Sequence, residues 1–240
     1  MTLHVRYTAP LVQIEEFEGT TMTFKAPDSL AEQIAHHLAE RIIRGEMKPG
    51  ERIQEQKVTL ALNVSRGSVR EALLILERRH LIAILPRRGA HVTELTAHKV
   101  RSLCTLMGEL YILLGNAVAK GWQVQADLAP FLQIQQRLQG SYERQDIRAF
   151  VDDSFNVMRA AYPFADNPYL QETVENLQPA MSRAYFLALD QRKASMSEYL
   201  ALFEQLLAAV IARDFPQIRE VLTAYGQRSC DLVISALTDA

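Results

Sequence analysis

The run from Asn63 to Leu73, with the sequence NVSRGSVREAL, places the tightest constraint on how this chain can fold. Ser65 is a residue type that caps helices, because its hydroxyl can accept a hydrogen bond from a free amide of the first turn. Arg66 and Arg70 lie on one face of the predicted helix, where a planar cation can bond to a guanine edge or a phosphate. The run therefore predicts a DNA-recognition helix from Ser65 to Arg79. Its opposite face is apolar at the i, i+3, i+4, i+7 spacing of a buried surface: Val69, Ala72, Leu73 and Leu76.

The net charge of −2 does not indicate a nucleic-acid partner, but the distribution of the charges does. Residues 50–91 carry eight Arg or Lys against four Asp or Glu, whereas residues 96–240 carry thirteen against sixteen. The basic excess therefore surrounds the predicted recognition helix. This clustering is typical of a DNA-binding module joined to a neutral or acidic domain.

The composition indicates a globular protein that is not inserted in a membrane. The 240 residues are 48% hydrophobic and 22% charged, which allows two domains with separate cores. We find no apolar run near the roughly 20 residues of a membrane-spanning helix and no signal peptide, so we expect a cytoplasmic location. Cys104 and Cys230 stand far apart, which argues against a disulfide framework and against a zinc–thiolate site.

Two further helices are expected before the recognition helix. Residues 29–32 (SLAE) have the pattern of a capping box, and an apolar face follows them until Gly45. A turn at 47–50 separates this helix from a second one, from Gln54 to Leu62. Residues 1–26 show no helical period, and we expect an extended arm there with a short strand near 11–14.

A short hairpin is predicted directly after the recognition helix. Residues 81–85 (LIAIL) and 90–93 (AHVT) favour strands, and the turn between them contains Arg87 and Arg88. A two-stranded hairpin must pack against other elements to be stable, which places these arginines beside the recognition helix. A merely solvated turn is the other interpretation, but the position favours a wing that contacts phosphate or the minor groove.

From Thr96 onward the pattern is helical almost throughout. Six helices are expected from the positions of caps, prolines and glycines, at 96–121, 127–139, 146–162, 167–190, 197–213 and 214–237. The predicted fold class is therefore mainly α. A winged helix-turn-helix domain at 27–95 precedes an all-α bundle of about six helices at 96–240, which is long enough to enclose a small pocket.

Together these motifs resemble the GntR-type transcriptional regulators, in the branch with an all-helical FCD or FadR-like effector domain. The resemblance covers about residues 27–240 and rests on the segments PGERI (49–53), VSR (64–66), VREAL (69–73) and RGAHV (88–92). The family implies a homodimer on a short palindromic operator in double-stranded DNA. That agrees with geometry, because a single recognition helix reads only a few base pairs.

The resemblance also implies which residues contact DNA. They come from the first turn of the recognition helix and from the wing, and here they are Ser65, Arg66, Gly67, Ser68, Arg70, Arg87, Arg88 and Gly89. The chain has Gln56 where members usually carry an arginine in the preceding helix. It also has Gly-Ser at 67–68 in place of a frequent Thr-Pro, so we expect its base preference to differ.

Many members of this branch bind a divalent metal through one aspartate and three histidines. The resemblance aligns Asp152 with the aspartate, but Asn156, Phe203 and Tyr225 stand at the histidine positions. All six histidines of the chain lie at or before residue 98. A carboxylate and an amide with two aromatic side chains lack strong donors for a first-row divalent ion, so we expect no metal and no other cofactor.

The same positions predict a pocket for a small organic effector, in which Asn156 and Tyr225 are neutral hydrogen-bonding groups. Arg183 is the basic residue that could pair with a ligand carboxylate, which makes an organic acid a candidate effector. The predicted pocket contains Asp152, Asn156, Arg183, Phe203 and Tyr225. A solvated Arg183, and simple core packing of Phe203 and Tyr225, are the competing interpretations.

These features predict a DNA-binding transcriptional regulator, a repressor controlled by a small-molecule effector. The alternative is a regulator whose effector domain has become ligand-free. An enzyme is not expected, because the helical domain has no histidine, no cysteine beside a base and no glycine-rich phosphate loop. Its adjacent Asp152 and Asp153 point roughly 100° apart on a helix and cannot share one substrate proton.

Overall fold

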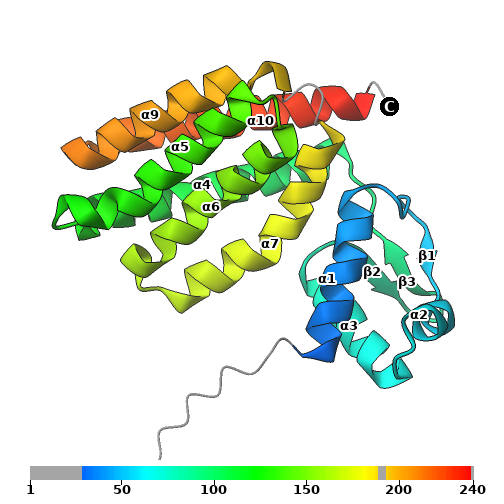
Figure 1. Cartoon of the computed structure of the whole chain (residues 1–240). Helices are drawn as coiled ribbons and strands as arrows, with labels where there is room; N and C mark the ends of the chain where they lie inside the picture. The colour runs from blue at the N-terminus through cyan, green and yellow to red at the C-terminus, as the bar shows by residue number, and fades with distance from the viewer. Residues whose placement is uncertain (1–28, 189–192, 239–240) are drawn as a thin grey trace, which may run out of the picture.

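The computed structural model describes residues 29–188 and 193–238. The predicted arm at 1–26 and the predicted helix end near 190 lie outside these residues. Two hydrophobic cores form, one from side chains between Ile34 and Val92 and the other from side chains between Val100 and Ala236. The predicted fold class is confirmed, because a small winged domain precedes a helical bundle (Figure 1).

The winged domain has the predicted order of elements. Its helices are α1 (Leu30–Ile43), α2 (Glu55–Leu62) and α3 (Arg66–Arg78), each within two residues of the expected bounds. Its strands are β1 (Arg52–Ile53), β2 (Ile82–Leu85) and β3 (Gly89–Val92), in the antiparallel order β1-β3-β2. The hairpin β2–β3 is the predicted wing. The sequence prediction missed β1, because two residues are too few to show the alternation of a strand.

A side-chain cap and an ion pair fix the start of α1 in the winged domain. Ser29 caps α1 as expected, since its hydroxyl accepts a 3.2 Å hydrogen bond from the amide of Glu32. Glu32, which a capping box would turn back toward Ser29, instead accepts a 2.8 Å hydrogen bond from Nη2 of Arg79. This ion pair ties the start of α1 to the end of α3, above a core that includes Leu38 and Leu76.

The bundle contains six α-helices within the described residues, as predicted. They are α4 (Ala97–Gly121), α5 (Ala129–Glu143), α6 (Ile147–Ala165), α7 (Pro168–Leu187), α9 (Met196–Ala212) and α10 (Phe215–Thr238). Thr96, Asp146 and Asn167 cap α4, α6 and α7 as expected. α4 is long and apolar enough to cross a membrane by length and composition alone, but it packs against α6, α7, α9 and α10 as a core helix.

One predicted cap in the bundle is wrong. Asp127 was expected to start the second bundle helix, but it lies in a short 3-10 helix, η1 (Gln125–Leu128). Its carboxylate accepts hydrogen bonds from the amides of Gln123 and Val124, at 2.8 and 3.1 Å. Asp127 therefore closes the turn after α4, and α5 begins only at Ala129.

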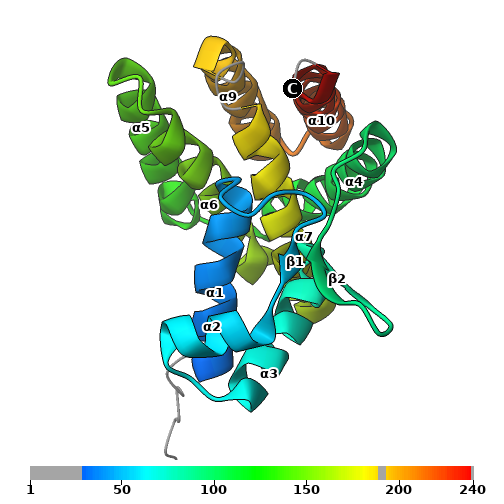
Figure 2. The same ribbon diagram turned by 90° about the vertical axis from the view of Figure 1, so that its right-hand side faces the viewer.

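The two domains meet where α1 packs along α7, and again at the linker 93–96 between β3 and α4 (Figure 1). Figure 2 shows α3 at the end of the winged domain that lies away from the bundle. A hollow of about 650 Å³ separates the domains elsewhere, lined by β2, the linker, α4 and α7. Glu77, at the C-terminal end of α3, also lines this hollow, so it is the first turn of the recognition helix that lies away from the bundle. Few elements hold the winged domain in place.

Candidate functional site

The first turn of α3 has the geometry expected of a recognition helix. The Ser65 hydroxyl accepts a 3.1 Å hydrogen bond from the amide of Ser68, and the hydroxyls of the two serines are 2.9 Å apart. Arg66 and Gly67 are exposed on this turn, and Arg70 is exposed one turn later. The opposite face is buried in the winged-domain core through Val69, Ala72, Leu73 and Leu76. The predicted division of the helix into an apolar face and a basic face is confirmed.

Arg70 has a partner that the sequence did not reveal. Its Nε donates a 2.9 Å hydrogen bond to Oε2 of Glu55 at the start of α2. The side chains of Arg70 and Glu55 are 68% and 39% exposed, so water screens this ion pair and can replace it at little cost. Arg70 is thus oriented by α2 but remains available to another anion.

The wing presents its arginines at the tip of the hairpin. Arg87 and Arg88 are exposed, and Arg87 has a φ of +61°. Gly89 has a φ of +81°, a conformation that a residue with a side chain adopts only under strain, so glycine suits this position. The tight turn holds the two guanidinium groups outside the sheet, where they can meet a phosphate.

Arg52 is a basic residue of this surface that the sequence analysis did not select. It lies on β1, directly opposite His91 on β3, and it is exposed. Its Nε is 3.7 Å from the position that a Cβ atom on Gly89 would occupy, so its guanidinium lies beside the wing turn. Arg52 belongs to the PGERI segment at 49–53, which the sequence does show. Only the structure shows that this segment pairs with the wing.

The residues predicted for the effector pocket do not all lie together. Phe203 and Tyr225 both line one cavity in the bundle, between α6, α9 and α10. Asp152 is exposed on α6. Asn156 is half-buried, but its amide donates to Asp153 and its carbonyl oxygen accepts from Arg159, so it belongs to a polar network on α6. The assignment of these residues to an effector pocket stays a prediction.

Arg183 lies at the domain junction. Its Nη1 donates hydrogen bonds to the carbonyl oxygen of Thr93, at 2.7 Å, and to the Thr93 hydroxyl, at 3.0 Å. Only 5% of the residue is exposed. The interpretation of Arg183 as a solvated surface residue is therefore wrong, and its guanidinium is engaged with the winged domain.

A cluster of aromatic side chains fills the interior of the bundle around Tyr225. The Tyr225 and Tyr185 hydroxyls are 3.0 Å apart, Tyr185 stacks on Phe155, and Tyr199 meets Tyr225 edge to face. Burial, together with the neighbouring tyrosines, raises the pKa of Tyr111 well above its ordinary value. A hollow of about 300 Å³ lies between α4 and α10, lined by neither Phe203 nor Tyr225. The cavities beside Phe203 and Tyr225 have volumes of only about 40, 30 and 20 Å³, whereas ligand pockets usually enclose roughly 300–1,000 Å³. The interior is thus closely packed in this state.

The side chains present do not fit a divalent metal. Phe203 has no donor atom, and the hydroxyl of Tyr225 is bonded to that of Tyr185. The described residues contain no group of three or more His, Cys, Asp or Glu side chains arranged to hold an ion. A first-row metal requires strong nitrogen, oxygen or sulfur donors, and these positions do not supply them.

A winged helix-turn-helix with exposed arginines, joined to a helical bundle, defines the class of DNA-binding transcriptional regulators. Two family profiles match the chain: "Bacterial regulatory proteins, gntR family" at residues 30–92 and "FCD domain" at residues 115–228. The chain belongs to the GntR family of transcriptional regulators and carries an FCD domain. It is a regulator and not an enzyme.

Similar proteins have the same organisation. The chain is 26% identical over 202 residues to the HTH-type transcriptional regulator McbR of Escherichia coli, covering 84% of this chain and 91% of McbR. It is 25% identical over 211 residues to the HTH-type transcriptional repressor RspR of E. coli, covering 84% and 88%. The solved structure of E. coli McbR has a TM-score of 0.72 at 24% identity, covering 86% of this chain and 98% of that structure, so the fold is shared.

Proposed function

We propose that this protein is a cytoplasmic repressor that binds a palindromic operator as a homodimer and responds to a small organic effector. The observation that carries the proposal is the exposure of Arg66 and Arg70 on α3, opposite a fully packed face. Arg87, Arg88 and Arg52 add cations on the same domain. Repression is supported by the name of RspR, a relative that covers most of the chain.

The operator proposal can be tested by selecting DNA in vitro from a random library with the purified protein. We expect enrichment of a two-fold symmetric sequence, because two domains related by symmetry read two equal half-sites. Binding should weaken steeply as salt increases, because arginines that contact phosphates release counterions. Selection that enriches no sequence, or binding that ignores salt, would refute the proposal.

The proposed homodimer uses α4. Leucines recur along this helix at the i, i+3, i+7, i+10 spacing of one face: Leu103, Leu106, Leu110 and Leu113. Leu103 and Leu110 are partly buried against the bundle core, whereas Leu106 and Leu113 are 47% and 55% exposed. Two exposed leucines on one face of a helix fit burial against a second copy of the chain. Light scattering should give twice the 27.2 kDa mass of one chain. The double change Leu106→Asp and Leu113→Asp should give a monomer, while Leu132→Asp on α5 should leave the dimer intact.

The proposed effector binds inside the bundle, beside Phe203 and Tyr225. Since the cavities there hold only water-sized molecules, ligand entry requires the aromatic cluster to repack.

A second candidate, a regulator with a ligand-free effector domain, is favoured by the same close packing. A thermal-shift screen of organic acids and other small metabolites separates them, because a ligand that binds the folded state raises the melting temperature. Stabilisation that is lost in Tyr225→Phe supports the effector; none across the screen supports the ligand-free domain.

A further inference from the structure

Arg183 is a buried cation that joins two parts of the chain 90 residues apart. It lies on α7 in the bundle, and both of its hydrogen bonds reach Thr93, at 2.7 and 3.0 Å. Thr93 follows β3 and begins the linker to α4. A single guanidinium thus connects the bundle with the only covalent link between the two cores.

Thr93 is in turn fixed to the winged domain. Its amide donates a 3.0 Å hydrogen bond to the carbonyl oxygen of Leu81. Its hydroxyl is 3.1 Å from the carbonyl oxygens of both His80 and Leu81. These two residues follow Arg79, the residue that caps the end of α3, so the chain of hydrogen bonds runs from α7 through Thr93 to the segment that leaves the recognition helix.

The buried charge of Arg183 depends on the two oxygens of Thr93. No carboxylate of the described residues lies within 4.0 Å of its guanidinium, and both of its acceptors are neutral oxygens. Burial lowers the pKa of Arg183, but arginine keeps its charge in proteins. A buried charge that loses its acceptors is strongly unfavourable. The winged domain can therefore turn away from α7 only if Arg183 finds new partners.

The contact between Arg183 and Thr93 lies where few other contacts join the two domains. Thr93 also lines the 650 Å³ hollow between the domains, where side chains of β2, α4 and α7 do not meet. Apart from the packing of α1 on α7, few contacts restrain the winged domain. A short, directional hydrogen bond at the linker restrains its rotation better than a sliding apolar contact does.

We infer that Arg183 is a positioning residue for DNA binding, which sets the orientation of α3 relative to the bundle through Thr93. The inference rests on the proposed function, since a fixed orientation matters when two recognition helices of a dimer must match one operator. Arg183 is buried at the domain junction, so its expected effect on DNA binding is indirect. Its removal should weaken the discrimination between half-site spacings, while leaving the recognition of one half-site unchanged.

The test compares full-length wild type with Arg183→Met on three kinds of DNA: one half-site, the selected palindrome, and palindromes with one to three base pairs added or removed. Arg183→Met should bind the half-site like wild type. It should bind the best palindrome at least about tenfold more weakly and discriminate less between spacings. Arg183→Lys, which keeps the charge and replaces the guanidinium with an ammonium group, should recover part of the discrimination.

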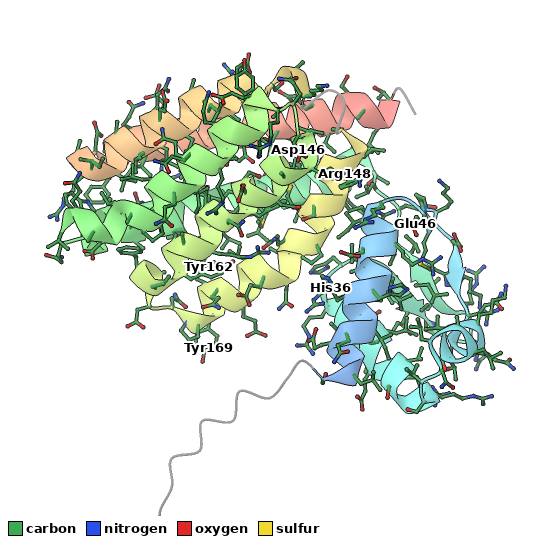
Figure 3. The ribbon with its side chains drawn as sticks, viewed as in Figure 1. His36, Glu46, Asp146, Arg148, Tyr162 and Tyr169 are labelled. Carbon is green, nitrogen blue, oxygen red and sulfur yellow. The ribbon has the colours of Figure 1, made fainter. Side chains whose placement is uncertain are left out.

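Arg148→Met is the matched control. Arg148 lies on α6, with its guanidinium 5.3 Å from the centre of the Phe186 ring, beside the C-terminal end of α7 (Figure 3). It should retain the wild-type spacing preference. Thr93→Val removes one of the two acceptors, so it should show a weaker form of the Arg183→Met effect and should not add to it.

Two results for Arg183→Met would overturn the inference. A wild-type spacing preference in Arg183→Met overturns the inference. Equal losses on half-site and palindrome also overturn it, because Arg183 then only stabilises the fold. If Arg183→Met does not fold, Thr93→Val decides alone by the same comparison. A wild-type protein without any preference for palindromes refutes the proposed function itself.

Discussion

Glu55 on α2 accepts a 2.9 Å hydrogen bond from the guanidinium of Arg70 on α3, on the face of the winged domain that carries the proposed DNA contacts. An acidic residue at that place both orients Arg70 and repels the phosphates of DNA. The two effects oppose each other, and the exposure of the pair indicates that the first is small.

Glu55→Gln is therefore expected to strengthen binding to scrambled DNA by about fivefold, the equivalent of roughly 1 kcal/mol for one exposed charge. Operator binding should gain less, because Arg70 loses the partner that orients it. Fluorescence anisotropy at two salt concentrations measures both affinities. Glu198→Gln, which breaks the exposed pair with Arg228 in the bundle, is the control and should change neither affinity. A Glu55→Gln protein with unchanged affinity for scrambled DNA would contradict this account of the pair.

Tyr162→Phe is expected to stabilise the protein. The Tyr162 hydroxyl is buried and has no hydrogen-bond partner among the described residues. Removing an unsatisfied buried polar group is worth about 1 kcal/mol, which corresponds to a rise of roughly 2–4 °C in the melting temperature of a chain this size. Tyr169→Phe is the control, since Tyr169 is 80% exposed (Figure 3), and it should leave the melting temperature unchanged. A lower melting temperature for Tyr162→Phe would show that the hydroxyl has a partner.

The same residue predicts a loss of stability at alkaline pH. Burial, with Glu175 nearby, raises the pKa of Tyr162 to about 12 in the folded protein, from an ordinary value of 10.0. The unfolded chain therefore loses this proton at a lower pH than the folded protein does. The part of the free energy of unfolding that depends on the neutral Tyr162 hydroxyl is fully present below pH 10 and is lost as the pH rises toward 12. Urea titrations at pH 9, 10 and 11 should show a shallower decline for Tyr162→Phe than for wild type. Parallel declines for the two proteins would mean that Tyr162 is not the group involved.

Metal removal should have no effect on the bundle. Phe203 has no donor atom and the neutral amide of Asn156 is a weak one, so these positions lack the strong donors that a first-row ion requires. We expect the purified protein to contain far less than one equivalent of zinc, nickel or manganese per chain. Its melting temperature should be the same before and after dialysis against a chelator. A reversible loss of stability on chelation would show that other residues hold an ion.

Much of the fold was predictable, because local signals and tertiary packing agree. Ser65, Thr96, Asp146 and Asn167 mark helix starts in the sequence and cap helices in the structure. Asp127 misled the prediction because an aspartate can close a turn with the same amide hydrogen bonds it would use in a cap. The strand β1 was missed because its two residues are defined by their partner on β3, not by their own pattern.

The site was less predictable, because the direction in which a side chain points depends on contacts between distant segments. Arg66 and Arg70 follow from helical spacing alone. The partners of Arg70 and Arg183 do not, since Glu55 is 15 residues away and Thr93 is 90 residues away. The sequence suggested Arg183 as a partner for a ligand carboxylate, whereas burial and hydrogen bonding place its guanidinium on the linker.

Variants of two arginines on α3 show whether this helix reads DNA. The affinities of wild type, Arg66→Ala and Arg70→Ala are measured on the selected operator and on scrambled DNA of the same length. Arg66→Ala and Arg70→Ala should each lose about 1–3 kcal/mol on the operator, with a much smaller loss on scrambled DNA, because base contacts carry the specificity. Wild-type affinity for the operator in both variants would contradict the account.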